Sequence, residues 1–251
     1  MIPIMIRRKR LSGVALAAVL MCQTLGHGLG AASATKDMPL FNGKDTSGWR
    51  SPAGDWSAFE SATVEPADSK AFRLTRGSGV LVNGVVGKTG NLLTELEHGD
   101  VEAHIEFMVP AGSNSGIYFQ GRYEIQVLDS WGKETLAFGD CGGVYASCSG
   151  EPKCYSGKPP PVNASRKPGE WQSFDIVFRA PRFDGSGRKI QNARFVRVAH
   201  NGKVIHENVE VTCPTCASAF GDEAPHGPLM LQGDHGPVAY RNLTLKRLAL
   251  D

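Results

Sequence analysis

Seven residues in the middle of the chain, Tyr123 to Asp129 (YEIQVLD), place acidic and amide side chains inside an apolar strand pattern. Side chains alternate across a β-strand, so Glu124 and Gln126 are expected on one face and apolar residues on the other. Leu128 breaks this alternation, and a β-bulge there would return Asp129 to the face of Glu124. The motif therefore predicts two carboxyl groups and an amide on one surface, a set suited to acid–base chemistry.

The two carboxyl groups have more than one interpretation. A retaining glycosidase needs two carboxyl groups about 5 to 5.5 Å apart, which Glu124 and the shorter Asp129 would have to meet. The structural alternative is that both acids only satisfy buried backbone groups or pair with Arg122 and Arg241.

His235 is the third catalytic candidate, because it lies in the turn Gly233 to Pro237 between two expected strands, where functional residues often occur. His200 and His206 flank an Asn-Gly hairpin signal, are expected near solvent and receive no role. No compact spacing of histidines and carboxylates predicts a metal site, so we assign no metal and leave the cofactor open.

Trp131 directly follows the YEIQVLDS run and is the tryptophan we expect at the rim of a groove, where its ring would stack on a sugar. Trp49, Trp56 and Trp171 are expected in the core or in seams.

Charge and glycine patterns exclude two classes of partner. The formal net charge of +2 includes a basic N-terminus, so the remaining chain has no basic excess for nucleic acid. The glycine-rich stretch from Arg76 to Gly90 lacks the glycine pattern and the helix start of a nucleotide site.

The N-terminus is typical of a secretory signal peptide over residues 1–34. Arg7 to Arg10 precede an apolar run from Leu11 to about Leu25, and Ala32-Ser33-Ala34 follows. The run is too short and interrupted for a confident membrane span. We expect an exported, periplasmic or secreted bacterial protein whose mature chain starts near Thr35. Lipidation at Cys22 is the alternative.

Five of the six cysteines follow this leader, and in an exported protein they favour disulfides. Proximity suggests Cys148 with Cys154 and Cys213 with Cys216, which leaves Cys141 unpaired. The alternative is a zinc site of four thiolates from the same two pairs.

Short alternating runs recur along the chain without a sustained helical period, which predicts an antiparallel all-β protein. Expected strands are Asn91–Glu95, Val101–Val109, Gly116–Gln120, Tyr123–Leu128, Gln172–Arg179, Ala193–His200, Lys203–Glu207, Pro228–Gln232 and Val238–Leu248. We predict a single domain over residues 35–251, a jelly-roll β-sandwich of two antiparallel sheets with a concave groove.

The strand at Val101–Val109 has a polar face formed by Glu102, His104 and Glu106. A solvated outer face is the simpler interpretation of these residues. A ligand-binding cluster is the alternative.

Several motifs occur in one order along the chain. They are Leu40-Phe41-Asn42-Gly43-Lys44 with Gly48-Trp49, Asn114-Ser115-Gly116-Ile117-Tyr118, the YEIQVLDS run, Gly169-Glu170-Trp171-Gln172, Gly227-Pro228-Leu229 and Asp234-His235-Gly236. Together they resemble the 3-keto-disaccharide hydrolase domain family from about Leu40 to Leu248. The resemblance implies a concanavalin-like jelly roll acting on sugars oxidised at carbon 3. Asn114 and Tyr118 of the second motif become substrate-binding candidates.

The chain departs from the family pattern at a cysteine-containing insertion around Ser147 to Lys158 and at Gly233, and either change affects the groove or its rim. A more distant resemblance links Glu124, Gln126 and Asp129 to the Glu-x-Asp-x-x-Glu strand of laminarinase-type glucanases, with the same spacing and altered residue types.

A ketone at carbon 3 acidifies the proton at carbon 2, so that a base can form an enolate that expels the group at carbon 1. Glu124 is the expected base, Gln126 a hydrogen-bonding residue for the substrate, and Asp129 a second acid or an orienting group. The expected partner is a 3-keto sugar. A non-catalytic carbohydrate-binding module and a structural envelope protein are the alternatives.

Overall fold

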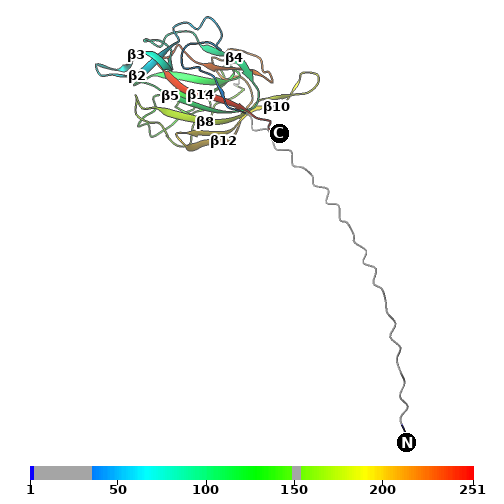
Figure 1. The fold of residues 1–251 in the computed structure, drawn as a ribbon. Coiled ribbons are helices and arrows are strands. Elements are labelled where there is room, and N and C mark those ends of the chain that lie inside the picture. The colour runs from blue at the N-terminus through cyan, green and yellow to red at the C-terminus, as the bar shows by residue number, and fades with distance from the viewer. Residues whose placement is uncertain (3–35, 149–153) are drawn as a thin grey trace. The chain divides into compact units, whose positions relative to one another are not determined.

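The chain folds into two large packed antiparallel sheets, as its short alternating runs predict, and a separate two-stranded sheet formed by residues 182–183 and 189–191 (Figure 1). The computed structural model describes residues 1–2, 36–148 and 154–251. All of its strands lie in the unit from Thr35 to Asp251. The predicted leader, apart from its first two residues, lies outside the described residues. Within the described part there is no helix with the length and hydropathy needed to cross a membrane.

Fourteen strands run through the described residues. In chain order they are β1 (Met38–Pro39), β2 (Ser57–Glu65), β3 (Asp68–Val82), β4 (Leu92–His98), β5 (Val101–Met108), β6 (Asn114–Phe119), β7 (Tyr123–Leu128), β8 (Gln172–Arg179), β9 (Arg182–Phe183), β10 (Lys189–Gln191), β11 (Ala193–His200), β12 (Lys203–Val211), β13 (Gly227–Leu231) and β14 (Ala239–Arg247).

The larger sheet has the order β12-β11-β8-β5-β14-β3-β2, and β1 pairs with the second half of β14. Figure 1 shows β8, β5 and β14 side by side across this sheet. Along β8 every second residue is buried. Its inward side chains, Phe174, Ile176 and Phe178, belong to the main apolar core. Such alternation is what one buried and one outer sheet face require.

The smaller sheet has the order β4-β13-β6-β7, which makes β7 an edge strand. Its core face contributes Ile117, Phe119, Ile125 and Val127 to the same apolar cluster. The opposite face of β6 and β7 is also buried, because loops cover it. Burial on both faces distinguishes this sheet from a half-exposed one and makes an enclosed site possible.

The prediction of strands was correct at β7, β8 and β11, whose bounds match the expected ones. The long hairpin of β2 and β3 was missed. Its residues alternate poorly, and most are half-buried or exposed at the sheet edge. Because periodicity reports burial on one face, an edge hairpin gives a weak signal.

The Asn201-Gly202 turn joins β11 and β12 with positive φ at both residues, as the hairpin signal predicts. The expected solvent exposure of His200 and His206 is wrong, since both are buried. His200 lies against Phe174, with ring centroids 4.7 Å apart. The local bulge in the β11–β12 ladder and the loops covering it turn these rings inward.

The cysteine pairing expected from proximity is also wrong. The bridges are Cys148–Cys216 and Cys154–Cys213, because the segment after Val144 lies beside the segment after β12. Cys141 is free and buried, as the odd count predicted. Four bridged sulfurs provide no thiolates, which removes the zinc alternative.

The polar face of β5 has the character of a charged outer face. His104 Nδ1 lies 2.7 Å from Asp175 Oδ1, and Arg241 Nε donates to Glu106 Oε2 at 2.6 Å. These cross-strand pairs satisfy the side chains without a ligand, in agreement with the simpler interpretation.

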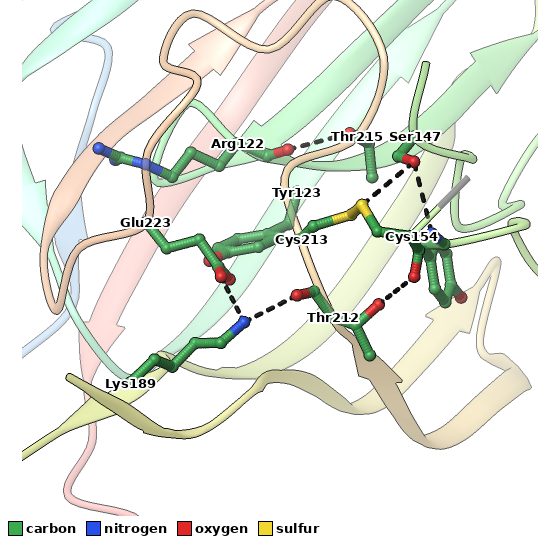
Figure 2. The surroundings of a disulfide bond; sticks show 10 residues. Arg122, Tyr123, Ser147, Cys154, Lys189, Thr212, Cys213, Thr215 and Glu223 are labelled. Atoms are coloured by element: carbon green, nitrogen blue, oxygen red, sulfur yellow. Dashed lines mark hydrogen bonds and ion pairs between the residues drawn. A yellow bond between two sulfur atoms is a disulfide. The ribbon is translucent and has the colours of Figure 1, made fainter. Parts of the chain in front are cut away.

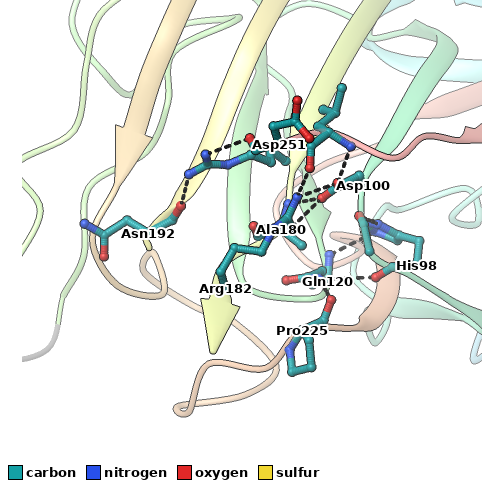
Figure 3. A network of polar contacts seen from close by, with 11 residues as sticks. His98, Asp100, Gln120, Ala180, Arg182, Asn192, Pro225 and Asp251 are labelled. Carbon is teal, nitrogen blue, oxygen red and sulfur yellow. Dashed lines mark hydrogen bonds and ion pairs between the residues drawn. The ribbon is translucent and has the colours of Figure 1, made fainter. Parts of the chain in front are cut away.

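Asp100 joins three segments far apart in the sequence at the end of the sandwich (Figure 3). Its carboxylate accepts hydrogen bonds from the Ala180 and Leu250 amides and from the Arg182 guanidinium. Burial alone would raise the pKa of Asp100, but these hydrogen bonds outweigh burial and lower it. The lowered pKa means that folding favours the ionised carboxylate.

Asp100→Asn is expected to lower the free energy of unfolding at pH 7 by about 3 kcal/mol, because Arg182 loses its ionic partner in a largely buried pair. The lowered pKa gives the sign. The stabilisation is present above the unfolded-state pKa of about 4 and disappears as the pH falls through the folded value. Urea unfolding at pH 7 and pH 3 measures this, with the exposed Asp55→Asn as control. An equal loss in the free energy of unfolding at pH 7 and pH 3 would contradict this prediction.

Candidate functional site

The polar face of β6 and β7 borders a pocket of about 100 Å³. The lining side chains and backbone come from β6, β7, the segment after β7, the disulfide-bonded segment after β12 and the residues after β13. They are Asn114, Tyr118, Glu124, Gln126, Tyr145, Cys216, Ala217, Gln232 and His235. Five of the seven site residues predicted from the sequence therefore meet in one pocket, which we call the Glu124 pocket.

The antiparallel ladder of β6 and β7 sets the spacing inside this pocket. Tyr118 pairs with Glu124, and Gly116 pairs with Gln126. A Cβ atom on Gly116 would lie only 2.3 Å from Oε1 of Glu124. The missing side chain at Gly116 thus provides the space that the carboxyl occupies.

Glu124 is 2% exposed, and its pKa is raised to about 8. Burial is the main cause, since a carboxylate loses hydration in the pocket. A hydrogen bond from the Tyr118 hydroxyl acts in the opposite direction and is too weak to cancel burial. A carboxyl with this pKa exchanges protons near neutral pH, as a general base or acid must.

The arginines considered as structural partners of Glu124 pair with other acids. Arg122 donates to Asp222 Oδ1 at 2.9 Å, and Arg241 donates to Glu106. The interpretation of Glu124 as one half of an ion pair with either arginine is therefore wrong. Neither arginine neutralises the Glu124 carboxylate, so burial raises the pKa of Glu124.

Gln126 extends the polar surface beside Glu124. Its Nε2 donates to Asn114 Oδ1 at 3.2 Å and to the Gly139 carbonyl at 3.1 Å, and these two bonds fix the amide orientation. Its Oε1 is buried and has no partner among the described residues. A buried acceptor without a partner costs free energy, so it favours a ligand that offers a hydroxyl.

His235 lies at the pocket with its Nδ1 2.5 Å from Asp234 Oδ1. Asn83 anchors the turn that carries it by donating to the Gly233 and Gly236 carbonyls. The imidazole is half-exposed at the mouth of the pocket.

The bulge expected at Leu128 is absent, since the β6–β7 ladder keeps one register from Tyr123 to Leu128. Asp129 consequently does not line the pocket. Its carboxylate instead accepts from the Gly112 and Trp131 amides and fixes the loop after β7. The predicted pair of carboxyl groups on one surface is wrong for this reason.

Trp131 is 52% exposed and is not among the lining residues. Lys167 Nζ lies 5.8 Å from its ring centroid. Trp49 and Trp56 are buried, as expected, and Trp171 is half-buried under the Arg241 guanidinium.

Sequence reasoning missed Tyr145, Cys216, Ala217 and Gln232. Tyr145 reaches the pocket because its backbone amide donates to the Glu124 carbonyl, so the segment runs beside β7. Gln232 is the last residue of an expected strand, so the strand pattern could have identified it as a candidate. Cys216 and Ala217 depend on the bridge to Cys148, which proximity in sequence does not indicate.

The pocket contains one carboxyl group, Glu124, as far as residues 36–148 and 154–251 define it. One buried carboxyl with phenol, amide and imidazole neighbours is suited to proton abstraction with hydrogen-bond stabilisation of an oxyanion. In the same residue ranges no group of three or more histidine, cysteine or acidic side chains gathers in a way that could hold a metal ion.

A jelly-roll β-sandwich with a polar pocket on one sheet is the architecture of many carbohydrate-active proteins. The chain belongs to the family of the 3-keto-alpha-glucoside-1,2-lyase-like domain, whose model matches residues 36–246. This membership confirms the family expected from the sequence motifs.

Solved structures of similar proteins agree with this assignment. A candidate glycosyl hydrolase from Parabacteroides distasonis ATCC 8503 is 31% identical, with a TM-score of 0.63 over 84% of each chain. A second from the same organism is 20% identical, with a TM-score of 0.54 over 85% of this chain and 100% of the other, and supports the fold. Among curated proteins, none matches the chain. Family and relatives support a carbohydrate-active function.

Glu124→Gln is expected to make the protein more stable than the wild type at neutral and higher pH. Wild-type Glu124 stays protonated in the folded state up to about pH 8, whereas the unfolded chain ionises from about pH 4.5. The contribution of Glu124 to the free energy of unfolding of the wild type therefore falls as the pH rises between these values, by up to about 1.4 kcal/mol per pH unit. Glutamine does not titrate.

Urea unfolding at pH 4, 6 and 8 measures the difference between the two proteins. The exposed Glu134→Gln is the matched control and should show no such trend. A difference between Glu124→Gln and the wild type that stays constant with pH would show that Glu124 titrates normally.

Proposed function

We propose that this protein cleaves 3-keto-glycosides by removing the proton at carbon 2, with Glu124 as the base. The observation that carries the proposal is a single buried carboxyl whose pKa is raised to about 8 inside a polar pocket. The family description, a 3-keto-alpha-glucoside-1,2-lyase-like domain, supports the same chemistry.

The reaction uses the acidity that the carbon 3 ketone gives to carbon 2. Ionised Glu124 takes the proton from carbon 2, and the electron pair forms an enolate on the carbon 3 oxygen. The enolate collapses to a double bond between carbons 1 and 2 as the bond from carbon 1 to the leaving oxygen breaks. A base with a raised pKa has a stronger driving force for the first step.

The neighbours of Glu124 supply the remaining roles. The Tyr145 hydroxyl and the Asn114 amide are the candidates for stabilising the enolate oxygen, a function that needs preorganised donors. His235 gives a proton to the leaving oxygen, and Asp234 stabilises the imidazolium. Gln126 accepts from a sugar hydroxyl through its unpaired Oε1.

Water then completes net hydrolysis. It adds to carbon 1 of the conjugated ketone, and Glu124 returns a proton to carbon 2. Release before this addition gives a lyase, and release after it gives a hydrolase. Both outcomes begin with the same proton abstraction by Glu124.

A conventional glycosidase fits the pocket less well. Both the retaining and the inverting mechanisms use two carboxyl groups that flank the scissile bond. Asp129, the second acid of the predicted motif, serves the loop after β7 instead. A purely binding module would need no carboxyl with a raised pKa.

Turnover of 3-keto-glucosides and 3-keto-trehalose tests the proposal. kcat/KM should rise about tenfold per pH unit below pH 8, because only ionised Glu124 acts as a base. Glu124→Gln should reduce kcat by about 10²-fold or more, while Glu134→Gln should match the wild type. Unchanged turnover by Glu124→Gln, or ketosugar binding without turnover by the wild type, would contradict the assignment.

We also propose that residues 1–34 direct export. The two disulfides support this proposal, because such bridges persist in oxidising compartments. Expression of the full chain in a bacterium, followed by N-terminal sequencing of the periplasmic fraction, should find a mature protein starting near Thr35. An uncleaved leader would contradict export by this route, and a lipid-modified Cys22 would show attachment to a membrane.

A further inference from the structure

The Glu124 pocket has a wall made by the disulfide-bonded segment from Cys213 to Ala217. Cys216 and Ala217 line the pocket, and the Cys216 carbonyl accepts a hydrogen bond from the Tyr118 hydroxyl at 3.2 Å. The same hydroxyl contacts the Glu124 carboxyl. One phenol therefore connects the carboxyl to a backbone carbonyl of the wall.

This arrangement suits both protonation states of Glu124. When the carboxyl is protonated, the Tyr118 hydroxyl donates to the Cys216 carbonyl. When the carboxyl is ionised, the same O–H rotates to donate to the carboxylate, because a hydroxyl hydrogen turns freely to its best acceptor. Tyr118 remains a donor throughout, since burial, the largest cause, and the neighbouring Glu124 charge both raise its pKa.

The position of the Cys216 carbonyl depends on the bridge to Cys148. Cys216 also donates its amide to the Ala146 carbonyl at 2.8 Å, so the wall and the segment after Val144 are held together twice. The next residue, Ala217, has a φ of 56°, a left-handed conformation that a residue with a Cβ adopts only when its surroundings hold it.

The second bridge has different surroundings. Cys154–Cys213 lies beside Thr212, whose carbonyl accepts from Lys189, and Lys189 pairs with Glu223 (Figure 2). Neither Cys154 nor Cys213 lines the pocket. The two bridges span 68 and 59 residues, so they restrict the unfolded chain almost equally. The two bridges are therefore comparable in the unfolded chain, but only Cys148–Cys216 lies at the Glu124 pocket.

We propose that the Cys148–Cys216 disulfide is a positioning element for Glu124, which it serves by holding the Cys216 carbonyl and the pocket wall against the Tyr118 hydroxyl. The inference deepens the proposed function and rests on Glu124 as the base. Without the bridge the wall loosens, water reaches the carboxyl, and Tyr118 donates to Glu124 alone. Both changes stabilise the carboxylate.

The sign of the effect follows from these contacts. Replacing both Cys148 and Cys216 by serine should lower the pKa of Glu124 by about one pH unit or more, because hydration and a full hydrogen bond both favour the ionised form. Tyr118→Phe should raise this pKa, because it removes a donor to the carboxylate while keeping both bridges.

Carboxyl ¹³C NMR titration of Glu124 measures these shifts without any substrate, and the acid limb of the kcat/KM profile should move with them. The double serine variant of Cys154 and Cys213 is the control and should leave the pKa of Glu124 in place. Equal pKa values of Glu124 in both double variants would overturn the proposal and leave Cys148–Cys216 with a role in stability only.

Two further outcomes are separable. If the Cys148 and Cys216 variant does not fold, Tyr118→Phe still tests the contact, and an unchanged pKa of Glu124 in that variant overturns the proposal. If Glu124→Gln keeps its turnover, the proposed function fails, whereas the NMR titration still shows whether the bridge controls the carboxyl.

Discussion

The proposed chemistry of this protein depends on the free energy of burying one carboxyl group. Glu124 is surrounded by protein on the outer face of the smaller sheet, and the main group that favours its charge is a tyrosine hydroxyl. Because no cation in the described part of the chain offsets the lost hydration, the proton stays bound to about pH 8. In the proposed mechanism, an acid that would be an inert carboxylate on an exposed strand becomes a base matched to a weakly acidic C–H bond.

That burial is achieved by covering an edge strand. The free edge of β7 is paired by Gly142, Gly143 and Tyr145, and the Glu124 amide donates to the Thr215 hydroxyl. An uncovered edge would offer its backbone groups to other chains and its side chains to water. The loops that satisfy the backbone of β7 are therefore the same loops that close the pocket over its polar face.

The sequence predicted the fold well because a sandwich is built from regularly alternating strands. β8 has buried side chains at every second position, and β11 alternates from Ala193 to Val196 before its register shifts, so the bounds of both strands could be read from the pattern. The site was predicted in part for the same reason, since Glu124 and Gln126 share a face with Asn114 and Tyr118 across the ladder. The error at Asp129 came from an assumed bulge, which depends on backbone packing that no residue pattern in YEIQVLD specifies.

The pocket wall lay beyond prediction. Cysteine spacing cannot distinguish bridges within a segment from bridges between segments, and only the path of the chain brings Cys148 to Cys216. Cys148, in the cysteine-containing segment around Ser147 to Lys158, thus holds through its bridge the residue whose carbonyl accepts from Tyr118 in the pocket.

Cleavage of a 3-keto-glucoside in D₂O tests the central claim most directly. Abstraction of the carbon 2 proton by Glu124, followed by addition of water, predicts that 3-keto-glucose formed at early times carries deuterium at carbon 2, observed by NMR. Free 3-keto-glucose incubated with Glu124→Gln corrects for exchange in the product. Product that retains its original hydrogen at carbon 2, together with a rate that deuterium at carbon 2 of the substrate does not slow, would contradict the account, because direct displacement at carbon 1 never breaks that bond.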